Sequence, residues 1–204
     1  MQNFYYAIKQ SPIGIIIPIW RLKPTFSLIK LSIITLATSN LFLIKELKQI
    51  GFSQEELPSF DNLLLESNTV DKLKIIENLF AKSQLFNKSE NHVIEKLKDT
   101  LEQYFISKLN IKFDTELLEL KNCSEFTRKV LLTLKEVPLG EVCTYGSLAK
   151  SAGYPKAYRA VGSVMNKNPF PLIIPCHRVI LSNGNIGEFT LGKETKKFLL
   201  QHEV

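Results

Sequence analysis

The spacing of apolar and polar residues predicts both strands and helices in the first half of the chain. An apolar run over residues 15–20 follows a turn at 11–14 and predicts a strand, and a run over 26–34, rich in Ile and Leu, predicts a second. Residues 61–82 have a helical character. A further helix is expected after Ser89, a candidate N-cap, because apolar residues then recur at spacings near four: Val93, Leu97, Leu101, Tyr104/Phe105 and Leu109.

The second half reads as a series of short elements. Ser124 is a candidate N-cap for a helix with apolar positions at Phe126, Val130, Leu131 and Leu134. Residues 145–152 and 156–166 predict two short helices, and the turn Gly153-Tyr154-Pro155 between them makes a helix-turn-helix pattern. An Asn168-Pro169 break, a strand at Val179–Leu181, a tight turn at Asn183-Gly184 and a closing helix over 193–202 follow.

These elements predict an α/β (α+β) protein. We expect a small mixed strand/helix N-terminal scaffold domain over residues 1–120. A mainly helical C-terminal domain with the helix-turn-helix is expected over residues 121–204.

Candidate chemistry lies in the stretch from Ile173 to Ile180, where Cys176 and His177 stand side by side between two apolar runs. Such runs normally form buried strands, so this placement indicates a thiol held in a pocket. A free cysteine with a pKa of about 8.5 is only a few per cent thiolate at neutral pH, and it therefore needs a base. The alternative is a buried small side chain beside an imidazole whose hydrogen bonds are satisfied.

Composition and charge narrow the class of protein. The chain has 204 residues and 45% hydrophobic content, which argues against general disorder. The net charge is +6, and all of the excess lies in residues 121–204, which hold 12 Lys+Arg against 6 Asp+Glu. Such a domain attracts polyanions through phosphate contacts, although a lysine-rich surface is a common alternative.

The three cysteines, Cys123, Cys143 and Cys176, have no metal-ligand spacing. Without a secretory signal, they are expected to be free thiols in a reducing cytosol. The uncharged run over 31–44 is too short to span a bilayer. We therefore expect no metal, no cofactor and no membrane association. A cytoplasmic monomer is expected, associated with the nucleoid if the source is prokaryotic.

Several ordered blocks resemble the O6-alkylguanine-DNA alkyltransferases, which move alkyl groups from guanine onto their own cysteine. The resemblance covers residues 124–204 strongly and the first 120 only weakly, and Pro175-Cys176-His177-Arg178-Val179 is its most specific block. The other blocks are Phe126-x-x-x-Val130, Val137-Pro138-x-Gly140-Glu141, Thr144-Tyr145-Gly146-x-Leu148-Ala149, Arg159-Ala160-Val161-Gly162 with Met165-x-x-Asn168-Pro169, Gly187-x-Phe189, and Leu199-Leu200-x-His202-Glu203.

The resemblance implies a role for each matched residue of the reaction centre. Cys176 is the nucleophile, His177 activates it through a bound water, and Glu203 orients His177. Tyr145 hydrogen-bonds the flipped guanine and helps the leaving base take up a proton, and Asn168 braces the turn before the cysteine.

The resemblance also assigns contacts to the flipped base. The main chain at Cys176 and Val179 offers carbonyls to the exocyclic amine of guanine, and Thr190 lies near the alkylated oxygen. Leu191 stands where the family usually has a glycine, and two effects stay open: a narrower pocket or a change in which alkyl groups fit.

On the DNA side, Arg159 is expected to enter the duplex and fill the space left by the extruded nucleotide. Gly162 and Ser163 give the second short helix a thin face that suits the minor groove, and Lys156 is a candidate phosphate contact. A solvated lysine face and a surface arginine are the alternatives.

The resemblance therefore implies a DNA repair protein acting on double-stranded DNA. It is expected to flip O6-alkylguanine, mainly O6-methylguanine, and to transfer the alkyl group irreversibly to Cys176 as a methylated-DNA–[protein]-cysteine S-methyltransferase, once per molecule. Two alternatives stay open. One is a helix-turn-helix protein that binds alkylated DNA without transfer, and the other is a cysteine hydrolase.

Overall fold

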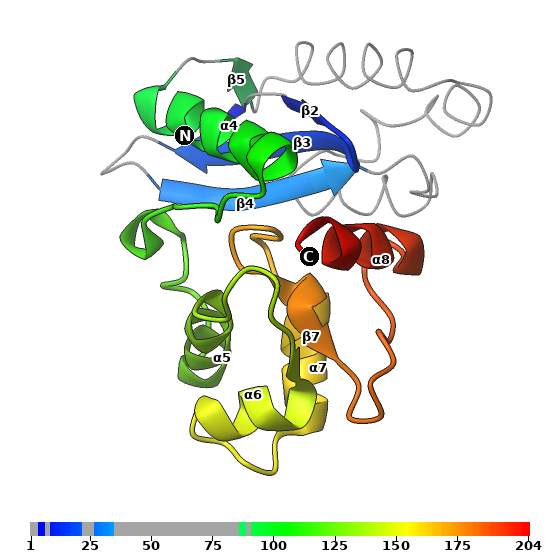
Figure 1. Cartoon of the computed structure of the whole chain (residues 1–204). Coiled ribbons are helices and arrows are strands. Elements are labelled where there is room, and N and C mark those ends of the chain that lie inside the picture. The colour runs from blue at the N-terminus through cyan, green and yellow to red at the C-terminus, as the bar shows by residue number, and fades with distance from the viewer. Residues whose placement is uncertain (1–3, 7–8, 22–26, 35–85, 89–90) are drawn as a thin grey trace, which may run out of the picture. The chain divides into compact units, whose positions relative to one another are not determined.

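The computed structural model describes residues 4–6, 9–21, 27–34, 86–88 and 91–204, and it shows a mixed α+β protein (Figure 1). This confirms the predicted fold class. The chain divides into two compact units, Met1–Ile94 and Glu95–Val204. The domain boundary predicted between residues 120 and 121 stays a prediction. The helical pattern at 61–82 and the candidate cap Ser89 lie outside the described residues.

The first unit contains a five-stranded sheet built around β3 (Gly14–Arg21). This strand pairs antiparallel with β1 (Phe4–Tyr6), β2 (Lys9–Ser11) and β4 (Ser27–Ile34). A fifth strand, β5 (Phe86–Lys88), runs parallel to β1. The strands predicted over 15–20 and 26–34 are confirmed as β3 and β4.

Strand β3 is buried on both faces. The consecutive residues Ile16 and Ile17 are 0% and 1% exposed, and consecutive side chains on a strand point to opposite faces. This is why β3 appears in the sequence as an almost continuous apolar run rather than an alternating one.

Helix α4 (His92–Ser107) follows the sheet in sequence. Asn91 lies directly before it and accepts a hydrogen bond from the Val93 amide at 2.9 Å, the interaction expected of a cap. Leu97, Leu101 and Tyr104 are buried, as the stripe predicted. Leu109 was wrongly included in that stripe, because the helix ends at Ser107 and Leu109 is 50% exposed.

The second unit is mainly helical. Ser124 accepts a hydrogen bond from the Thr127 amide at the start of α5, so the predicted cap is confirmed. The closing helix predicted over 193–202 is confirmed as α8. The elements after α4 are η1 (Thr115–Leu117), α5 (Glu125–Lys135), β6 (Cys143–Thr144), α6 (Tyr145–Ser151), α7 (Tyr158–Asn166), η2 (Cys176–Arg178), β7 (Val179–Ile180) and α8 (Lys193–His202).

Helices α6 and α7 pack on each other and on α5, at the end of this unit away from α8 (Figure 1). The turn between them contains Gly153 at φ +88°, a conformation that favours glycine. Helix α7 begins at Tyr158 rather than at the predicted Lys156. The reason is that the Ala157 amide bonds the Tyr154 carbonyl at 2.9 Å, which extends the turn.

The apolar run before Cys176 was predicted to be a buried strand, and this was wrong. Residues 171–174 form a buried turn, and Cys176 opens the short 3-10 helix η2. Prolines at 169, 171 and 175 supply no amide hydrogen, so this segment cannot form a regular strand ladder. The run is apolar because it is buried.

Within the described ranges, no helix has the length and apolar character needed to cross a membrane.

Candidate active site and nucleic-acid interface

Cys176 lies at the start of η2 and is 6% exposed. The Asn168 side-chain amide donates to its Sγ at 3.2 Å and to the Ile174 carbonyl at 2.8 Å. The Asn168 Oδ1 accepts from the Phe170 amide at 3.1 Å. Asn168 thus ties together both ends of the turn that carries the cysteine. The turn needs this support, because Leu172 adopts φ +72°, which is strained for a residue other than glycine.

Burial raises the pKa of the Cys176 thiol. The Asn168 amide, the Lys196 ammonium and the backbone amides of Cys176 and His177 oppose this shift by stabilising the thiolate. Because the net pKa shift is upward, the resting cysteine is protonated at neutral pH. A nucleophilic role therefore requires a nearby base.

His177 is 1% exposed, and its Nε2 lies 2.7 Å from Oε1 of Glu203. Burial alone would raise the pKa of Glu203, but hydrogen bonds from His177 and Arg178 hold it well below its usual range. The ionised carboxylate can only accept, so Nε2 of His177 carries the hydrogen. Burial lowers the pKa of His177, against the pull of Glu203, so the ring is neutral and Nδ1 holds a free lone pair.

The His177 Nδ1 atom is buried, and it has no hydrogen-bond partner among the described residues. It is therefore an orphaned basic atom on the residue adjacent to the thiol. A lone pair in this position is suited to accept a proton.

Arg178 and Tyr104 complete the surroundings of Glu203. Arg178 donates to Oε2 at 2.8 Å through Nε and to Oε1 at 3.0 Å through Nη2, a bidentate pair. Its Nη1 donates to the Val137 carbonyl at 2.6 Å. The Tyr104 hydroxyl donates to Oε1 at 2.7 Å. Sequence reasoning missed both residues, although a charged residue inside the apolar block around Cys176 was a signal for a buried ion pair.

Lys196 on α8 is fully buried, and its Nζ donates to the Val179 carbonyl at 2.6 Å. Burial lowers the pKa of Lys196, whereas the thiols of Cys176 and Cys143 act to raise it. When protonated, this buried lysine favours a thiolate at Cys176. The sequence reasoning missed it, but its position three residues before Leu199 places it on the buried face of α8.

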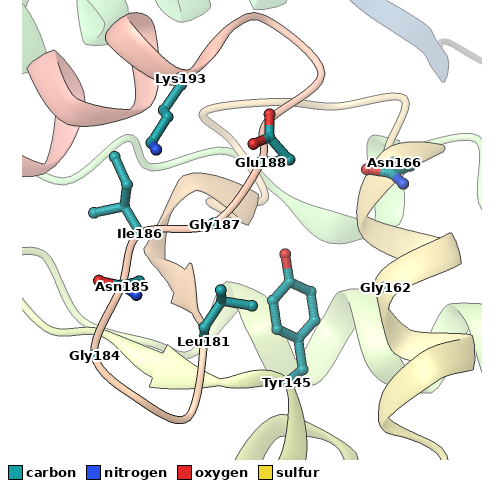
Figure 2. A pocket seen from close by; sticks show the side chains of 10 residues that line it. All are labelled: Tyr145, Gly162, Asn166, Leu181, Gly184, Asn185, Ile186, Gly187, Glu188 and Lys193. Carbon is teal, nitrogen blue, oxygen red and sulfur yellow. The ribbon is translucent and has the colours of Figure 1, made fainter.

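A pocket of about 670 Å³ is lined by Tyr145 of α6, Gly162 and Asn166 of α7, Lys193 and residues of the 181–188 loop. Cys176, His177 and Glu203 are not among its lining residues. Figure 2 shows the Tyr145 ring standing in this pocket with its hydroxyl pointing into it. Burial, with help from Cys176 and Cys143, raises the pKa of Tyr145, so the hydroxyl stays protonated. A Cβ added at Gly162 would lie 3.9 Å from the Tyr145 ring, so α7 passes close to it.

The two further residues predicted to contact the base, Val179 and Thr190, are not among the residues that line this pocket. Val179 is buried, and its carbonyl already accepts from Lys196, which leaves one lone pair. Thr190 is exposed, and its hydroxyl lies 3.5 Å from the Asn166 carbonyl, at the outer limit of a hydrogen bond. Leu191 is buried and is not among the residues that line this pocket.

The residues predicted to contact DNA lie on α7 or directly before it. Arg159, Ser163 and Lys156 are exposed, and Gly162 is half-buried. The Arg159 guanidinium lies 5.7 Å from the centre of the Tyr158 ring, a cation–π contact. Arg159, Gly162 and Ser163 thus lie on α7, and Lys156 lies in the turn before it.

The remaining thiols do not resemble the Cys176 site. Burial raises the pKa of Cys143 to about 11, and it also raises the pKa of Cys123. Both are half-buried. Among the described residues, no three His, Cys, Asp or Glu side chains are grouped so as to hold a metal ion.

Comparison with known proteins shows which proteins this chain is similar to. Residues 125–204 match the family model described as 6-O-methylguanine DNA methyltransferase, DNA binding domain. A methylated-DNA–protein-cysteine methyltransferase of Methanosarcina mazei is 40% identical over 131 residues, covering 61% of this chain and 81% of that protein. The one from Methanosarcina acetivorans is 47% identical over 103 residues, covering 50% of this chain but 64% of its own length.

The fold is also that of a solved relative. The crystal structure of Mycobacterium tuberculosis O6-methylguanine methyltransferase matches with a TM-score of 0.63 at 24% identity, covering 98% of this chain and 92% of that one. The extent of the match to the Methanosarcina mazei protein shows that this chain belongs to the methylated-DNA–protein-cysteine methyltransferase family.

Proposed function

We propose that this protein repairs DNA by moving the alkyl group of O6-alkylguanine, mainly O6-methylguanine, onto Cys176. The observation that carries the proposal is the arrangement of a buried thiol, the adjacent His177 with a free Nδ1, and the Glu203 carboxylate 2.7 Å from Nε2. The order of nucleophile, base and orienting carboxylate is that of a catalytic triad with cysteine as nucleophile. The names of the relatives, methylated-DNA–protein-cysteine methyltransferases, support methylated DNA as the substrate class.

The transfer step follows from the protonation states. His177 accepts the Cys176 proton at Nδ1 through a water, because Nε2 is held by Glu203. The thiolate attacks the alkyl carbon, an S–C bond forms, and the C–O6 bond breaks with its electron pair going to guanine. The protonated Tyr145 hydroxyl in the pocket hydrogen-bonds the leaving base and helps it take up a proton. The thioether formed at Cys176 has no route back to a free thiol, so each molecule acts once.

Two further groups stabilise the developing charge in this scheme. The Asn168 amide donates to Sγ at 3.2 Å, and the buried Lys196 ammonium favours the thiolate. Donors fixed in a site that excludes water are worth more than the same donors in water.

Duplex DNA is proposed to bind across α7. Residues 125–204 match a model described as a DNA binding domain, and Arg159, Ser163 and Lys156 are exposed there. Arg159 fills the space of the extruded nucleotide, while Gly162 and Ser163 leave room for the minor groove. The proposal also includes action as a monomer in the cytoplasm, at the nucleoid in a prokaryote, without a cofactor.

The test is the intact mass of the protein after mixing with a duplex oligonucleotide that contains one O6-methylguanine. A stoichiometric gain of one methyl group, absent from a Cys176→Ala variant, is the expected result. Binding to the lesion without a mass gain would reject transfer and leave a damage-binding protein. Turnover of an ester substrate would point instead to a cysteine hydrolase.

A further inference from the structure

Tyr104 is a buried titratable residue that the proposed transfer step does not use. It lies on α4, 99 residues before Glu203, and is 1% exposed. Two hydrogen bonds hold it to the end of α8. Its hydroxyl donates to Oε1 of Glu203 at 2.7 Å, and its backbone carbonyl accepts from Nε2 of His202 at 2.8 Å.

The Glu203 oxygen that accepts from the Tyr104 hydroxyl also has two other hydrogen-bond partners. Oε1 also lies 2.7 Å from Nε2 of His177 and 3.0 Å from Nη2 of Arg178. Each donor draws negative charge from this oxygen, so the donors compete for it. The strength of the His177–Glu203 bond therefore depends on whether the Tyr104 hydroxyl is present.

The Tyr104 hydroxyl is a permanent donor. Burial, followed by the neighbouring Glu203 carboxylate, holds the pKa of Tyr104 far above its usual range. An ionised phenol could not donate, but this one stays protonated at any pH at which DNA repair is relevant. Its effect on Oε1 is therefore constant.

We propose that Tyr104 is a positioning residue that sets the basicity of His177 by sharing the carboxylate oxygen to which His177 is bonded. The inference rests on the proposed function, since it concerns the base of that reaction. By weakening the pull of Oε1 on the imidazole, Tyr104 keeps His177 neutral to lower pH. The Nδ1 lone pair then stays available to take the cysteine proton.

The test uses the full chain with Tyr104→Phe, which keeps the ring and removes the hydroxyl. Single-turnover transfer from O6-methylguanine duplex is measured against pH. The midpoint, the pH at which the rate reaches half of its maximum, is expected to rise by about 0.5 to 1 pH unit. At higher pH, the rate of the variant is expected to stay within about threefold of the rate of the unmodified protein. The ¹⁵N NMR titration of the His177 ring is expected to shift in the same direction.

Three comparisons isolate the effect. Tyr154→Phe makes the same change at a half-buried tyrosine outside the Glu203 cluster, and it is expected to leave the midpoint unchanged. In a Glu203→Gln background, Tyr104→Phe is expected to have no further effect on the midpoint. Replacing Tyr104 with 3-fluorotyrosine, a stronger donor of nearly the same shape, is expected to move the midpoint downward.

A uniform loss of rate with an unmoved midpoint would show that Tyr104 only supports the fold, and it would overturn the inference. Unchanged titration of His177 in both the phenylalanine and fluorotyrosine proteins would overturn it as well. If the unmodified protein transfers no methyl group, the proposed function fails. The His177 titration still decides the inference about Tyr104.

Discussion

The reaction centre and the α7 surface differ in almost every physical respect. Cys176, His177 and Glu203 are each less than 10% exposed. Asn168 donates to Cys176, and Glu203 is bonded to side chains from α4 and η2. Arg159, Ser163 and Lys156 lie exposed on or just before one helix. The first region is fixed in advance by the protein itself, whereas the second is open to a partner.

The difference in exposure indicates that the two regions have separate functions, one in the chemistry and one in binding a partner. A buried site gives the thiol a defined base and excludes competing water, but it cannot search for a substrate. Exposed basic side chains can meet a polyanion at many positions without specificity. Substitutions in the first region should therefore affect chemistry and stability, and those in the second should affect DNA binding.

The largest effect is expected for Cys176→Ser. The serine hydroxyl ionises far less readily than a thiol, so methyl transfer should fall by at least about a thousandfold. The single-turnover rate, read as protein mass, measures this. Cys143→Ser is the matched control and should stay within about twofold, because Cys143, unlike Cys176, has no histidine next to it in the chain. Loss of transfer in Cys143→Ser but not in Cys176→Ser would show that Cys143, and not Cys176, is the nucleophile.

Next comes Glu203→Gln, which leaves Arg178 buried without its charged partner. Breaking a buried ion pair from one side costs about 3–5 kcal/mol of unfolding free energy, measurable by urea denaturation. The depressed pKa of Glu203 adds a pH signature. Its stabilisation is present above the unfolded pKa of about 4.3 and is lost as pH falls toward the folded value. The unfolding free energy of Glu203→Gln should therefore fall less with decreasing pH than that of the unmodified protein. An equal fall in both proteins would contradict the role of Glu203 as a buried, ionised carboxylate.

A smaller effect is expected for Arg159→Ala. Losing the side chain that fills the space of the flipped base should slow transfer from duplex DNA by about 10- to 100-fold, or roughly 1.4–2.8 kcal/mol. Transfer from a free O6-alkylguanine base should change little, because no nucleotide has to be extruded. An equal loss on both substrates would place Arg159 in the reaction centre and break the division between the two regions.

The smallest effect is expected for Lys156→Ala. Loss of one phosphate contact should weaken binding a few-fold for all sequences and reduce the slope of log K against log salt by about one. Binding titrations at several salt concentrations measure the slope. Lys121→Ala removes an exposed lysine outside α7 and should leave the slope unchanged. The same slope for both variants and the unmodified protein would remove Lys156 from the interface.

Much of the fold was predictable where local signals dominate. The Ser124 cap, the apolar positions of α5 and the bounds of α8 were all evident in the sequence. The turn before Cys176 was not, because its apolar residues are typical of a buried strand, although prolines at 169, 171 and 175 cannot donate to a strand ladder.

The candidate site was predictable only in part. The structure places Cys176, His177, Asn168 and Glu203 in one connected region, although their roles stay predictions. Tyr104 was seen only as one apolar-face position of a helix. Its hydroxyl bond to Glu203 spans 99 residues, and no local pattern reports a partner at that distance.

The long sequence separation of these contacts has a consequence for folding. The bonds of the Glu203 cluster close loops of 26, 41 and 99 residues, from His177 to Glu203, Val137 to Arg178 and Tyr104 to Glu203. Contacts of this kind form late, after the intervening segments have folded. Glu203 therefore orients His177 only when the surrounding unit is correctly assembled. In a misfolded chain, Cys176 has an adjacent imidazole but no carboxylate that holds it.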